Sequence, residues 1–106
     1  MSYNILNLPD GSIKGYQGLG FNTPTITNIT ENVDTTAPED CMLCCGCRGI
    51  NIWYTISING VNVGYIGGDV NLWSWFCVPV VKGAVVKVHL TGAQTIYNAM
   101  FQFISY

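Results

Sequence analysis

The feature that most constrains this chain is a two-residue alternation of side-chain character, which runs with few interruptions from Cys41 to the last residue. Turn pairs such as Asn59-Gly60 and Lys82-Gly83 divide it into short segments. A period of two places successive side chains on opposite faces of a strand, and short strands separated by turns are typical of a sandwich or a barrel. The pattern therefore predicts an all-β fold, a small antiparallel sandwich.

The composition favours strands over helices. Hydrophobic residues make up 49% of the chain and charged residues only 9%, against roughly 25% charged in an average soluble domain. Ten Asn, nine Thr, five Ser and twelve Gly are present instead, and these residues suit turns and strands better than helices. A length of 106 residues allows one small core, which excludes a two-domain enzyme.

The charge argues against two classes of partner. The net charge is −2 and the whole chain has four basic residues, which leaves no positive surface for a phosphate backbone or an anionic membrane. Residues 1–14 contain no continuous apolar run of the length that a secretory signal or a membrane span requires. We therefore expect no nucleic acid, no membrane insertion, and retention in the compartment where the chain is made.

The clearest local prediction is a hairpin formed by residues 52–58 and 61–66. Asn59-Gly60 lies between them, and Asn-Gly is the preferred pair for a type I′ turn, in which both residues need a positive φ. Such a turn fixes the register of the two strands. The pairs expected across the hairpin are Ile58 with Val61, Ser57 with Asn62, Ile56 with Val63, and Tyr54 with Tyr65.

Three further strands are expected within 72–81, 84–90 and 94–106. In the first, both alternating sets are apolar: Leu72, Phe76 and Val78 form one set, and Trp73, Trp75 and Cys77 form the other. A strand of a small antiparallel sandwich normally has one face toward water. A second apolar face predicts a cover, either the N-terminal segment or another subunit, and a homo-oligomer is the simpler explanation. Trp73, Trp75 and Cys77 are the candidate interface residues.

The N-terminal third differs from the rest, because it is rich in glycine and acidic residues and lacks a sustained alternation. Within it, residues 23–30 alternate Thr with Ile, and Pro24 favours an edge or docking strand there. We predict two parts: an extended attachment or oligomerisation segment over 1–35, and a β-sandwich domain over 36–106.

The cysteines form a C-x-x-C-C-x-C cluster of Cys41, Cys44, Cys45 and Cys47, with Cys77 far away in the sequence. Four thiolates can bind zinc, and C-x-x-C is a common half-site. On one strand, however, Cys44 points to the opposite side from the other three. The favoured interpretation is tight apolar packing with no metal. The alternative is a metal site at Cys41, Cys44, Cys45 and Cys47, or a disulfide. Either would make this chain a small metal-binding or redox protein.

Catalysis has few possible participants. The chain has one histidine, His89, and six carboxylates, so few acid–base or nucleophilic arrangements can be built. His89 is predicted on the solvent face of its strand. We predict no catalytic residues, no cofactor and no enzymatic activity.

A further alternative is a carbohydrate-binding module in which Trp53, Trp73 and Trp75 form an aromatic platform.

Four segments, in order along the chain, are similar to landmarks of one known family. Thr36-Ala37-Pro38-Glu39-Asp40-Cys41 resembles a Thr-Ala-Pro-x-Asp-Gly step, with Cys41 in place of the glycine. Residues 52–63 resemble a hairpin around Asn-Gly, residues 78–83 a Val-Pro-Val-x-Lys-Gly step, and residues 99–106 a closing Phe-x-Phe-Ile strand. The family that these segments resemble is the C-terminal jelly-roll knob of bacteriophage tail fibres and head fibres, related in architecture to tumour-necrosis-factor-like trimers.

The resemblance implies a homotrimeric jelly roll and a non-enzymatic structural virion protein: a fibre, capsid decoration or tail-tip knob. It further implies assembly in the host cytoplasm, attachment to other virion proteins through the N-terminal segment, and outward loops that contact host-surface glycans. The family pattern includes no catalytic residue, and it does not include the cysteine cluster.

Overall fold

The computed structural model describes residues 23–106, and within this range all regular structure is β. The strands are β1 (Thr25–Asn28), β2 (Thr35–Thr36), β3 (Cys41–Ile50), β4 (Ile52–Ile58), β5 (Val61–Gly68), β6 (Ser74–Val80), β7 (Val85–Gly92) and β8 (Thr95–Ser105). No helix in these residues is long and apolar enough to cross a membrane. The predicted all-β fold is confirmed.

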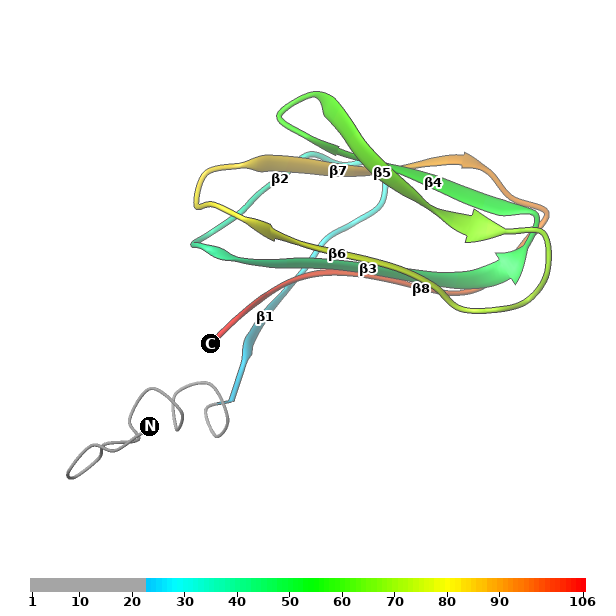
Figure 1. The fold of residues 1–106 in the computed structure, drawn as a ribbon, viewed down its shortest axis with the longest axis horizontal. Coiled ribbons are helices and arrows are strands. Elements are labelled where there is room, and N and C mark those ends of the chain that lie inside the picture. Colours follow the sequence, from blue (N-terminus) through cyan, green and yellow to red (C-terminus); the bar gives the residue numbers. More distant parts are fainter. Residues whose placement is uncertain (1–22) are drawn as a thin grey trace, which may run out of the picture.

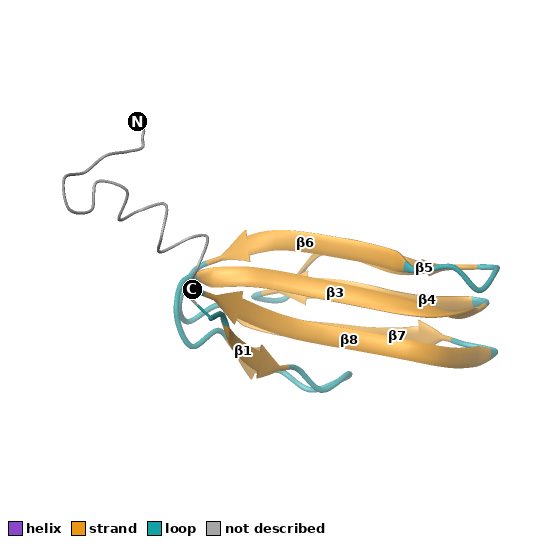
Figure 2. Ribbon diagram, turned by 90° about the horizontal axis from the view of Figure 1, so that it is seen from below, coloured by secondary structure: helices purple, strands orange, loops and turns teal. Residues whose placement is uncertain are grey.

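The strands form two four-stranded sheets that lie face to face (Figure 1). One sheet has the order β1-β8-β3-β6 and the other has the order β2-β7-β4-β5, and the pairing is antiparallel throughout. Figure 2 looks onto the first sheet, whose strands lie side by side. Along the chain, each connection crosses to the other sheet except the β4–β5 hairpin. The two sheets therefore make a β-sandwich.

The core between the sheets is built from alternate residues of the strands. Its largest buried side chains include Leu43, Tyr54, Ile56 and Phe103. Tyr54 also packs edge-on against Phe101, with ring centroids 4.9 Å apart. Because burying one large apolar side chain contributes about 1.5–3 kcal/mol, this shared layer holds the sheets together.

The β4–β5 hairpin has the turn that Asn59-Gly60 predicts. Both residues have a positive φ, 51° and 81° respectively, as a type I′ turn requires. The predicted pairs Ile58 with Val61 and Ser57 with Asn62 are confirmed.

Beyond these two pairs the predicted register of the hairpin is wrong. The pairing shifts between Ser57 and Ile56, so that Ile56 lies opposite Gly64 and Tyr54 lies opposite Ile66. A β-bulge adds one residue to β5, and a shift of one residue sends every later side chain to the other face. Ile66 is therefore buried with the core, and Tyr65, expected beside Tyr54, is exposed.

β6 occupies most of the predicted strand 72–81, but Leu72 lies outside it. Phe76 and Val78 pack against the core as predicted. Leu72 precedes the strand and is 71% exposed, so its predicted place on one side of the strand with Phe76 and Val78 is wrong. The alternation holds only where the chain is extended, and β6 begins at Ser74.

The strand expected within 23–30 is confirmed as β1, which lies at the edge of its sheet and pairs with β8. β2 pairs with β7 in the other sheet. The part of the predicted segment 1–35 that the structure describes thus contributes strands to both sheets. The rest of that predicted attachment segment, residues 1–22, lies outside the described residues.

Candidate functional site

The outer face of the β1-β8-β3-β6 sheet carries three rows of side chains. The first row is Ile26, Ile104, Met42 and Pro79; the second is Asn28, Gln102, Cys44 and Cys77; the third is Met100, Gly46 and Trp75. Directly opposite residues share a face, and the intervening residues Leu43 and Cys45 are buried in the core. The apolar and cysteine members of these rows, with Trp73, are called the outer apolar face.

The three rows are partly exposed and uncharged, and Arg48, paired with Asn98, lies beyond the third row. Trp75 is 53% exposed, Ile26 51% and Met42 39%, and no residue of the three rows is Asp, Glu, Lys or Arg. Soluble monomers rarely expose contiguous apolar patches larger than a few hundred Å². Depletion of charge is characteristic of the buried centre of protein interfaces. The face has the chemistry of a surface that a partner covers.

Trp73 and Trp75 form a stacked pair at one end of this face. Their ring centroids are 5.0 Å apart and their planes differ by 11°. Trp75 lies against the backbone of β3 at Gly46: a Cβ added to this glycine would overlap the carbons of the indole ring. The absence of a side chain at Gly46 therefore allows the ring to lie on the sheet.

The structure brings the three candidate interface residues, Trp73, Trp75 and Cys77, to this one face. Trp53 does not join them. It belongs to β4 in the other sheet and packs at a tilt against Tyr65, with ring centroids 6.4 Å apart. A single platform of three tryptophans, the alternative expectation, is thus replaced by two separate aromatic pairs.

The cysteine cluster divides as the strand alternation predicts. Cys45 and Cys47 are buried in the core, and Cys41 packs against it. Cys44 points outward, opposite Cys77. Because the four cysteines lie on two faces of β3, their thiols do not converge on one point, and among residues 23–106 no group of three or more His, Cys, Asp or Glu is placed to hold a metal ion.

All five cysteines are free thiols. The surroundings of the four cysteines on β3 favour the protonated form. Burial is the largest influence: it raises the pKa of Cys45 to about 12 and also raises the pKa of Cys47. For Cys44, burial first and then the neighbouring Cys77 thiol raise the pKa to about 11. A buried thiol with a raised pKa is a poor nucleophile at neutral pH. The inward thiols therefore act as packing groups.

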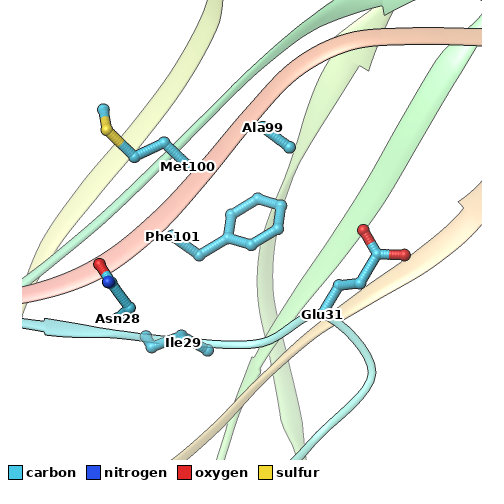
Figure 3. A pocket seen from close by; sticks show the side chains of 6 residues that line it. All are labelled: Asn28, Ile29, Glu31, Ala99, Met100 and Phe101. Carbon is cyan, nitrogen blue, oxygen red and sulfur yellow. The ribbon is translucent and has the colours of Figure 1, made fainter.

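A pocket of about 390 Å³ lies between the end of β1 and the middle of β8 (Figure 3). Its lining residues are Asn28, Ile29, Glu31, Ala99, Met100 and Phe101. The Tyr54 hydroxyl donates a hydrogen bond of 2.9 Å to Oε1 of Glu31. Burial first, and then this hydrogen bond, raises the pKa of Tyr54. Sequence analysis missed the pocket, because segments about 70 residues apart form it and neither carries a local motif.

His89 lies exposed on β7, as predicted, with Nδ1 2.8 Å from Oδ1 of Asn32. The same Asn32 oxygen accepts a hydrogen bond from the backbone N–H of Leu90. These contacts hold the segment between β1 and β2 against β7. The histidine is therefore part of a surface contact that positions the chain.

Comparison of the chain with protein-family models, with curated proteins and with solved structures found no match. The resemblance to bacteriophage fibre knobs accordingly rests on the four sequence segments alone.

Proposed function

We propose that this chain is a non-enzymatic structural protein that assembles with copies of itself through the outer apolar face. The observation that carries the proposal is the combination of exposure and missing charge over the three rows of the β1-β8-β3-β6 sheet. A closed homo-oligomer covers such a face on every subunit. The proposed number of copies is three, which follows from the family resemblance.

The proposed fold is a jelly roll. Its support is the strand order, β1-β8-β3-β6 facing β2-β7-β4-β5, with connections that alternate between the sheets. Eight antiparallel strands in two packed sheets are the general form of that architecture. Two of the four landmark segments also coincide with a defined feature: residues 52–63 with the β4–β5 hairpin, and residues 99–106 with the end of β8.

The proposed setting is a bacteriophage virion, with the chain as a fibre, decoration or tail-tip knob assembled in the host cytoplasm. Attachment to other virion proteins is assigned to the N-terminal segment. Because residues 25–36 contribute strands to the sandwich, this attachment role falls on residues 1–22, which lie outside the described residues.

A second candidate function is binding of host-surface glycans, favoured by the stacked and exposed pair Trp73 and Trp75. Aromatic rings that present an open face are suited to stacking with the apolar face of a sugar ring. This function competes with self-assembly for the same surface. If a neighbouring copy covers Trp75, the pair is not open to a glycan.

Sedimentation across a concentration series tests the proposal. Trp75→Ala removes the exposed ring from the proposed interface, and a truncated interface anchor costs about 2 kcal/mol or more, roughly 30-fold in the dissociation constant. Tyr65→Ala is the matched control, because Tyr65 is an exposed aromatic residue on the other sheet. The proposal predicts dissociation of Trp75→Ala alone. Equal sedimentation of the wild type and both variants would contradict it, and binding of a glycan array that only Trp75→Ala abolishes would favour the second function.

A further inference from the structure

Cys44 and Cys77 face each other across two neighbouring strands. They are directly opposite residues in the antiparallel pairing of β3 with β6. The flanking pairs, Leu43 with Val78 and Cys45 with Phe76, turn toward the core, so both thiols point outward from the sheet. Cys77 is exposed and Cys44 is half-buried.

The spacing of this pair suits a disulfide. Directly opposite residues of antiparallel strands have Cα atoms about 4.5–5.5 Å apart, and disulfides span Cα separations of about 4.4–6.8 Å. Both side chains also extend from the same outward face of the paired strands. We propose that Cys44 and Cys77 are an oxidisable dithiol that closes to an intrachain disulfide when it reacts with a small-molecule disulfide such as glutathione disulfide.

The reaction proceeds by two thiol–disulfide exchanges. The Cys77 thiolate attacks one sulfur of glutathione disulfide, the sulfur–sulfur bond breaks, and one glutathione thiolate leaves. Cys44, deprotonated as it attacks, then displaces the second glutathione from the Cys77 sulfur. The protein loses two electrons and two protons, and glutathione disulfide is reduced to two glutathione molecules.

The order of the two steps follows from exposure. Cys77 is open to a dissolved oxidant, whereas Cys44 is half-buried and burial raises its pKa to about 11. Cys44 is therefore poorly ionised until the mixed disulfide is next to it. The buried thiols Cys45 and Cys47 lie on the other side of β3 and are closed to the oxidant.

The bond would join an edge strand to the middle of its sheet. β6 is the edge of the β1-β8-β3-β6 sheet and carries Trp75 two residues before Cys77. Oxidation would thus fix the position of β6 on the outer apolar face. The proposed assembly would cover Cys77 on this face, so the oxidant reaches the pair in the separated chain.

Trypsin provides a direct test in the full chain. Cleavage after Lys14, Arg48, Lys82 and Lys87 places Cys44 in the peptide 15–48 and Cys77 in the peptide 49–82. After treatment with glutathione disulfide, mass spectrometry without reduction should find these two peptides linked, and the intact chain lighter by about 2 Da. The reaction is run at low protein concentration, where the chains are separated, and at high concentration, where the proposed assembly covers Cys77. The same link is expected in both, and it is expected to form faster at low concentration.

Matched serine variants identify the partner of Cys77. Cys44→Ser should abolish the link between the two peptides, and Cys41→Ser, also at a half-buried cysteine of β3, should retain it. The proposal is overturned if no link forms at either concentration, if the link survives in Cys44→Ser, or if the product is a disulfide-bonded dimer of two chains. Circular dichroism of each variant establishes that it is folded.

Discussion

The two outer faces of the sandwich differ in what their strands present to solvent. On the β2-β7-β4-β5 sheet, polar residues lie opposite one another, as Thr55 does with His89 and Ser57 with Lys87. On the β1-β8-β3-β6 sheet, the three rows are uncharged and mostly apolar, and Arg48 lies beyond the third row. The first face thus carries polar and charged side chains beside the exposed Trp53–Tyr65 pair. The difference assigns the proposed self-assembly to one sheet and leaves the other free.

The largest expected effect comes from placing a charge on the outer apolar face. Cys77→Asp should weaken assembly about 100-fold or more, because an uncompensated buried charge costs about 3–5 kcal/mol. Thr55→Asp, the equivalent change on the β2-β7-β4-β5 sheet, should leave assembly unchanged. Light scattering over a dilution series measures the assembled mass of both variants. Equal masses at every concentration would contradict the distinction between the two faces.

A smaller effect is expected from Gly46→Ala. The added methyl group would overlap the Trp75 ring, so the indole must leave its place on β3, and we expect a dissociation constant raised about 10-fold, or about 1.4 kcal/mol. The control is Gly68→Ala, where a Cβ meets no atom within 4 Å. Isothermal dilution calorimetry measures the dissociation constants of Gly46→Ala and Gly68→Ala. Trp75 fluorescence that is unchanged in Gly46→Ala would show that the ring does not rest on this glycine.

The smallest effect tests the core between the two faces. Tyr54→Phe removes the hydrogen bond to Glu31, and we expect a loss of about 1 kcal/mol in the free energy of unfolding. Assembly should not change, because Tyr54 lies on neither outer face. Urea unfolding at pH 7, with sedimentation of the same samples, separates stability from assembly.

The same variant has a defined pH dependence. Burial raises the pKa of Tyr54 in the folded state above its ordinary value of 10.0. A group with a raised folded pKa contributes stability that is complete below the unfolded pKa and is lost as the pH rises toward the folded pKa. Above pH 10.0 the wild type should therefore lose stability more steeply than Tyr54→Phe. The thiols with raised pKa are common to both proteins, and parallel curves would contradict the assignment to Tyr54.

The sequence was informative where a local signal decides the structure. Asn59-Gly60 predicts the turn, and the alternation along β3 predicts that Cys44 points away from Cys41, Cys45 and Cys47. Local signals did not predict the bulge in β5, because a strand with apolar residues in both phases fits either register. Tyr65 was misplaced for that reason.

Features made by distant segments were beyond prediction from the sequence. The pocket at Glu31 requires the pairing of β1 with β8, and the separation of Trp53 from Trp75 depends on which sheet each strand joins. The apolar second face of β6, in contrast, is predicted by the sequence. It was read from the residues of a single strand, and the structure extends it over neighbouring strands.

The central claim is that copies of this chain cover the outer apolar face in a closed assembly. Native mass spectrometry of the purified full chain, with and without a chelator, tests it most directly. The account predicts a mass of three chains that the chelator leaves unchanged. A single-chain mass at every concentration would contradict the assembly, and a mass increment per chain that the chelator removes would contradict the interpretation of the inward cysteines as packing groups.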